Sequence, residues 1–128
     1  ENALTVAKFL ESSDKIASVR YPALPGNEHY ERAQKYLPMG TSGVMSIDIK
    51  GGRAPAMKFM DSLKLACNEV HVADIRTCVL HPASETHRQL TDEQLVAAGI
   101  EPGMVRISVG LENVEDIIAD LKQALDQI

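Results

Sequence analysis

Two segments of the chain alternate apolar and polar residues with the period of a β-strand. The segments are residues 44–49 and 105–109, and in each of them every second residue is apolar. A period of two is typical of strands with one buried face. Such strands need another layer to cover the apolar face, so the rest of the chain has to supply that layer.

Helical spacing of apolar residues predicts most of the covering layer. An opening helix ends near residues 12–14, a second can be capped by Asn27 and is closed by Pro38, and a third starts near Pro55 and continues as far as Cys67. Residues 77–80 read as one more strand, which lies after the third helix.

The last part of the chain has clear helix starts. Thr91 and Gln94 can form a capping box for a short helix that ends at Gly99. Asn113 can cap a final helix with a continuous apolar stripe.

The order of elements predicts an α+β two-layer sandwich with a small mixed or mainly antiparallel sheet and helices on one face. Arg106 and Ser108 would then point to the open face, where a further domain could dock.

Length and composition exclude several classes of function and partner for this chain. The 128 residues suit a single domain, and the net charge of −5 argues against nucleic-acid and membrane-surface partners, which require basic patches. Cys67 and Cys78 fit neither a disulfide framework nor a metal site, so we expect two reduced thiols in a cytoplasmic protein. No apolar run is long enough to span a bilayer.

Few polar residues stand out as site candidates from spacing alone. Arg106 could hold a carboxylate through two charge-assisted hydrogen bonds, or it could be an ordinary solvated arginine. His71 and Asp74 could form an acid–base pair or contact a substrate, or they could simply be turn residues. These patterns do not identify a reaction.

Several motifs resemble a known family. Residues 105–112 read VRISVGLE and residues 81–87 read HPASETH. Both resemble the C-terminal part of pyridoxal phosphate (PLP) enzymes that act on cystathionine, homoserine esters and methionine. Within that family, residues 87–91 and 98–100 are most similar to the O-acetylhomoserine sulfhydrylases.

The resemblance implies that residues 1–128 are the C-terminal small domain of a fold type I enzyme. The family's carboxylate-binding arginine falls at Arg106, and His71 falls where relatives place Ser or Asn near the same carboxylate. Ala73 stands where the family commonly has Gly. The PLP lysine belongs to the large domain, so we expect no catalytic residue, cofactor or metal in this chain, and no activity of the chain alone.

The implied reaction of the whole enzyme is γ-replacement on O-acylhomoserine by sulfide or a thiol, in a homotetramer. A methionine γ-lyase or a cystathionine γ-synthase or lyase would use Arg106 in the same way, so these remain alternatives. A free-standing ligand-binding module is the alternative from another class of protein.

Overall fold

The computed structural model describes all of residues 1–128. The chain forms five helices and five strands, which follow one another in this order: α1 (Asn2–Glu11), β1 (Ile16–Arg20), α2 (Tyr30–Tyr36), β2 (Val44–Ile49), α3 (Arg53–Ser62), β3 (Cys67–Asn68), β4 (Cys78–Leu80), α4 (Asp92–Ala97), β5 (Met104–Ser108) and α5 (Val114–Leu125).

All five strands belong to one sheet in the order β1-β2-β5-β4-β3. The pairs β1–β2, β2–β5 and β4–β5 are antiparallel, whereas β3–β4 is parallel. The predicted mixed α+β sheet is therefore confirmed. The two segments with a period of two, β2 and β5, are neighbours near the centre of the sheet.

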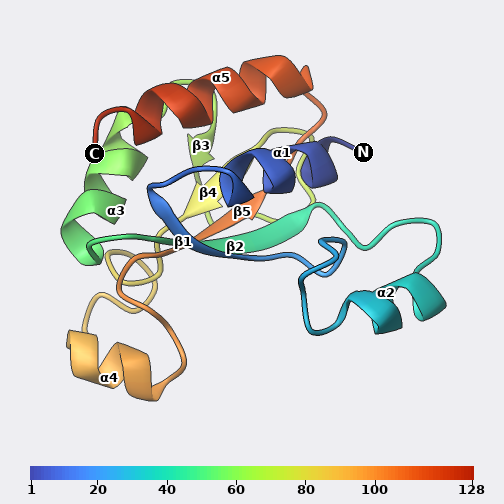
Figure 1. The fold of residues 1–128 in the computed structure, drawn as a ribbon. Coiled ribbons are helices and arrows are strands. Elements are labelled where there is room, and N and C mark those ends of the chain that lie inside the picture. Colours follow the sequence, from blue (N-terminus) through green and yellow to red (C-terminus); the bar gives the residue numbers. More distant parts are fainter.

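Helices α1, α3 and α5 cover one face of the sheet (Figure 1). Ile47 and Ile107, from the central strands, are fully buried beneath this layer, as are Leu10, Phe59 and Leu121 from the three helices. Burial of this apolar surface supplies most of the stability of such a domain. The opposite face of the sheet is not covered by these helices, as the alternation in β5 predicts.

Helices α2 and α4 lie away from the covering layer (Figure 1). Each buries one residue, Ala33 in α2 and Leu95 in α4, and neither residue belongs to the main core. The prediction that helices gather on one face thus holds for three of the five. Arg53 holds α4 in place, because its guanidinium pairs with Asp92 at 2.7 Å and donates to the carbonyl of Ala83.

The third helix is shorter than its apolar spacing predicts. It ends at Ser62, and Cys67 lies in β3, so the extension of the helix to Cys67 was wrong. The carboxylate of Asp120 in α5 accepts hydrogen bonds from the backbone N–H groups of Lys64, Leu65 and Ala66, each at 2.9 Å. These bonds fix the backbone in a turn, which directs it into β3.

Candidate substrate-binding site

A row of four side chains crosses the open face of the sheet. Arg20, Ser46, Arg106 and Leu80 are successive register partners on β1, β2, β5 and β4. Side chains of directly paired residues point to the same face, and their sequence neighbours Ile47, Val79 and Ile107 face the core. Arg106 therefore points away from the helical layer.

This row forms the floor of a hollow of about 600 Å³. The connection between β4 and β5 supplies one wall with Pro82, Thr86, His87 and Ile100. A hollow of this size can hold a small amino acid derivative, and its floor combines apolar surface with two guanidinium groups.

The two guanidinium groups differ in their charge balance. Arg20 pairs with Asp48 at 2.8 Å, and this carboxylate is buried, so the charge of Arg20 is compensated. Arg106 takes part in no ion pair, and its one hydrogen bond runs from Nη2 to the backbone carbonyl of Val70 at 2.6 Å. A guanidinium has five N–H donors, so most of those on Arg106 remain available for a ligand. A carboxylate is the ligand that matches this charge and fork geometry.

The histidines of the HPASETH segment have different surroundings. His81 is buried and contacts Ser84 Oγ and the carbonyl of Pro102, both at 2.8 Å. Because a carbonyl only accepts, Nε2 carries the hydrogen and Nδ1 accepts from Ser84. Burial lowers the pKa of His81, which favours this neutral form. His81 therefore stabilises the fold, whereas His87 is exposed and lines the hollow.

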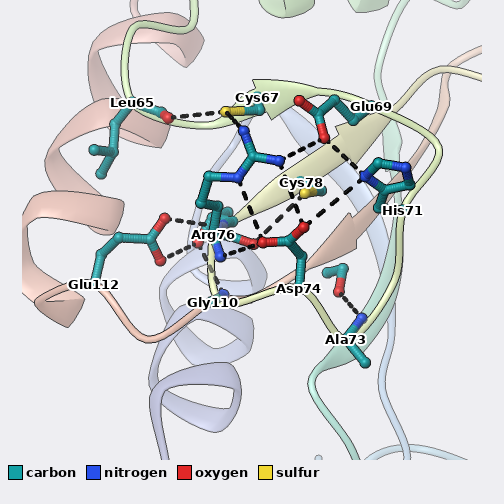
Figure 2. Close-up of polar contacts among 12 residues, drawn as sticks. Leu65, Cys67, Glu69, His71, Ala73, Asp74, Arg76, Cys78, Gly110 and Glu112 are labelled. Carbon is teal, nitrogen blue, oxygen red and sulfur yellow. Dashed lines mark hydrogen bonds and ion pairs between the residues drawn. The ribbon is translucent and has the colours of Figure 1, made fainter.

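His71 does not line the hollow around Arg106. Its Nδ1 lies 2.9 Å from Glu69 and 3.9 Å from Asp74, within a polar cluster over the β3–β4 edge of the sheet (Figure 2). It follows Val70, whose carbonyl contacts Arg106, so it lies on the segment that borders the candidate site. A contact between His71 and the substrate carboxylate stays a prediction.

Glu69, Asp74 and Cys78 bring three potential metal-ligand atoms within 4.8 Å of one another. The guanidinium of Arg76 already pairs with both carboxylates, at 2.9 Å from Glu69 and 3.4 Å from Asp74. Hydrogen bonds from the backbone and side chain of Arg76 lower the pKa of Asp74, which keeps this carboxylate charged and paired. The cluster is an ion-pair network, and the two cysteines are free thiols on paired residues of β3 and β4.

Sequence reasoning missed Arg20, Ser46 and His87 as parts of the hollow. Arg20 and Ser46 join Arg106 only through the register of three strands, which the sequence does not specify before the sheet is known. His87 lies in the HPASETH motif, but its place in the hollow depends on the path of the connection between β4 and β5.

Comparison with known proteins identifies the family. The family model described as "Cys/Met metabolism PLP-dependent enzyme" matches residues 1–126. The chain belongs to this family of PLP-dependent enzymes. It is 46% identical to O-acetyl-L-homoserine sulfhydrylase 1 of Thermus thermophilus over 125 residues, which are 98% of this chain and 30% of that protein. It is also 44% identical to an L-methionine gamma-lyase of Porphyromonas gingivalis, and covers 32% of that protein.

A solved structure agrees with this assignment. A crystal structure assigned as an O-acetylhomoserine (thiol)-lyase of Campylobacter jejuni superposes with a TM-score of 0.88 at 40% identity, over 98% of this chain and 30% of that one. That structure contains N'-pyridoxyl-lysine-5'-monophosphate. The present chain thus spans about a third of the length of its relatives in this PLP-dependent family.

The hollow around Arg106 does not by itself fit PLP. No lysine lines the hollow around Arg106, so no amine is placed to form a covalent bond with the cofactor there. Lys15 and Lys50 instead donate to the carbonyls of Ile128 and Asp14. A PLP site next to the hollow would have to be completed by other segments. Separately, no helix combines the length and the apolar character needed to cross a membrane.

Proposed function

We propose that this chain is the C-terminal small domain of a larger PLP-dependent O-acetylhomoserine sulfhydrylase, and that Arg106 binds the α-carboxylate of the amino acid substrate. One observation carries the proposal: an uncompensated guanidinium lies on the floor of an open hollow, held by a single backbone contact. Arg20 beside it is paired with Asp48, so Arg106 is the group with capacity for an anion.

The whole enzyme would catalyse a γ-replacement. Sulfide or a thiol takes the place of the acyloxy group of O-acylhomoserine, so the protein is a transferase. This chain would orient the substrate through its carboxylate, because a fixed guanidinium defines both the position and the rotation of that group. The identity of 46% with a sulfhydrylase supports this choice of reaction.

The large domain would supply the cofactor and its lysine. We infer that the 128-residue chain is inactive alone, since its hollow has no lysine. The open face of the sheet would dock against that domain, in an assembly expected to be a homotetramer. The two free thiols support a cytoplasmic location, where cysteines stay reduced.

Methionine γ-lyase is the second candidate, because a relative of that activity is 44% identical to the chain. Both activities use a carboxylate-bearing substrate, so the hollow does not separate them. Assays of the full-length protein do: the sulfhydrylase consumes O-acetylhomoserine and sulfide, whereas the lyase releases methanethiol from methionine.

Substitution of Arg106 tests the carboxylate assignment in either enzyme. In the full-length protein, Arg106→Met should raise KM for the amino acid about 30-fold or more, because about 2 kcal/mol of charge-assisted hydrogen bonding is lost. The PLP absorbance should be unchanged, because the substitution does not alter the lysine that binds the cofactor. Kinetics equal to those of the wild type would refute the assignment.

A further inference from the structure

Arg106 donates a hydrogen bond to the carbonyl of Val70, which lies in the segment between β3 and β4. Residues 69–76 connect β3 to β4, and two backbone hydrogen bonds tie their ends to the rest of the chain: Glu69 N–H donates to the carbonyl of Val79 at 3.0 Å, and the carbonyl of Ile75 accepts from the N–H of Leu111 at 2.8 Å. No residue of the segment lines the hollow, but its Val70 carbonyl accepts the one hydrogen bond that the Arg106 guanidinium donates.

Two side chains of β5 hold the centre of this segment. Arg106 donates to the carbonyl of Val70, and Ser108 Oγ accepts from the N–H of Ala73 at 3.0 Å. Arg106 and Ser108 are two residues apart, so they share the open face. The tetrapeptide 70–73 is thus fastened at both ends to the strand that carries the candidate substrate-binding arginine.

Within residues 1–128, burial does not hold the segment in place. Its large apolar side chains Val70, Val72 and Ile75 are 57%, 52% and 71% exposed. Ala73 adopts a left-handed conformation with φ of 58°, which is unfavourable for a residue with a Cβ. The position of this segment therefore depends on its polar contacts.

Arg76 forms ion pairs with two acidic residues of this segment, Glu69 and Asp74. Its Nη2 lies 2.9 Å from Glu69 Oε2, and its Nε and backbone N–H both donate to Asp74 Oδ1, at 3.4 and 2.9 Å (Figure 2). Glu69 and Asp74 are the residues that immediately flank the tetrapeptide 70–73. Carboxylate oxygens of the two lie within 4.8 Å of each other, so without Arg76 two like charges would repel across the base of the loop.

We propose that Arg76 is a positioning residue for substrate binding. By pairing with Glu69 and Asp74 it holds residues 70–73 against β5, and so keeps the Val70 carbonyl on Arg106. This inference rests on the proposed role of Arg106. Arg76 acts through its ion pairs with Glu69 and Asp74, which we call the Arg76 clamp, and it does not itself contact the substrate.

The test uses the full-length protein with Arg76→Met and, as a matched control, Lys122→Met. Lys122 also forms an exposed ion pair, with Asp126 at 2.6 Å on α5, so both variants lose one positive charge. Arg76→Met should raise KM for the amino acid substrate roughly threefold to tenfold with kcat within about twofold, because a network contact one step from the ligand carries coupling of this size. Lys122→Met should leave both constants unchanged.

Three further tests separate positioning from general damage. Backbone hydrogen exchange in residues 69–76 should become faster in Arg76→Met and not in Lys122→Met. Adding Glu69→Gln to Arg76→Met removes the repulsion and should bring KM back toward the wild-type value. Arg76→Lys, which keeps the charge but loses the fork, should lie between wild type and Arg76→Met, and it serves if the Met variant does not fold.

The outcomes distinguish this inference from the proposed function. If Arg106→Met raises KM but Arg76→Met matches Lys122→Met in both KM and exchange, the clamp is refuted and the role of Arg106 stands. A loss of kcat with unchanged KM would also refute the clamp. If Arg106→Met leaves KM unchanged, the proposed function itself is wrong.

Discussion

The buried carboxylate of Asp120 offers the clearest stability test of the fold. Asp120 is 7% exposed, and it accepts three backbone N–H bonds from residues 64–66 and one from Gln123. Asp120→Ala removes all four acceptor contacts. Hydrogen bonds to a charged group each contribute about 1.5–3 kcal/mol, but Lys64 and Leu65 are exposed, so their freed N–H groups can bind water. We therefore expect a loss of about 2–3 kcal/mol in the free energy of unfolding.

The same contact predicts a pH dependence with a definite sign. Burial alone would raise the pKa of Asp120, but the N–H groups of Ala66, Lys64 and Leu65 outweigh it and lower the pKa below its ordinary value. A depressed pKa in the folded state stabilises the fold above the unfolded pKa of about 3.9, and this contribution is lost as the pH falls toward the folded pKa.

Urea unfolding of the 128-residue chain at pH 7 and pH 3 measures both effects. The difference between wild type and Asp120→Ala should be largest at pH 7 and smaller at pH 3. Asp120→Asn keeps one acceptor oxygen and should lie between the two proteins at pH 7. A cost below about 0.5 kcal/mol at pH 7, or the same cost at both pH values, would refute the reasoning.

Two more predictions concern the fold. Gly103→Ala should lower the free energy of unfolding by about 2 kcal/mol in a thermal unfolding experiment, because the new Cβ would collide with the carbonyl of Ile49. Gly26→Ala is the control, because it has open space around it and should cost far less. Equal costs for the two variants would contradict the packing around Gly103. Burial lowers the pKa of His81, so the unfolded chain binds the extra proton and the fold should lose stability as the pH falls from about 7 to 5. His81→Gln, although less stable overall, should show a flatter dependence over this range, and an unchanged slope would contradict the assignment of a neutral His81.

Periodicity and capping chemistry predicted most of the local structure. The predicted cap of the second helix was wrong, because α2 begins at Tyr30 after His29, and the Asn27 side chain accepts from the N–H of His29 within the preceding turn. The period of two located β2 and β5, because strand side chains alternate between faces whatever the strand pairs with. Thr91 and Gln94 form the predicted capping box with both bonds made, and Asn113 caps α5 through the N–H of Glu115. These signals act over a few residues, so the local sequence contains them.

The features that sequence reasoning missed depend on distant residues. The end of α3 is fixed by Asp120, which lies more than 50 residues later, so the apolar spacing toward Cys67 was misleading. Strand β3 has two residues and exists because it pairs with β4. The row of Arg20, Ser46 and Arg106 needs the register of three strands. The Arg76 clamp likewise becomes visible only when Glu69 and Asp74 are placed in space.

The most direct test of the central claim compares two substrates that differ only at the α-carboxylate. In the full-length protein, kcat/KM for O-acetylhomoserine should exceed that for its α-carboxamide by about 30-fold or more, and Arg106→Met should abolish most of this preference while PLP stays bound. Equal preference in the wild type and in Arg106→Met would show that the carboxylate is bound elsewhere and would contradict the account.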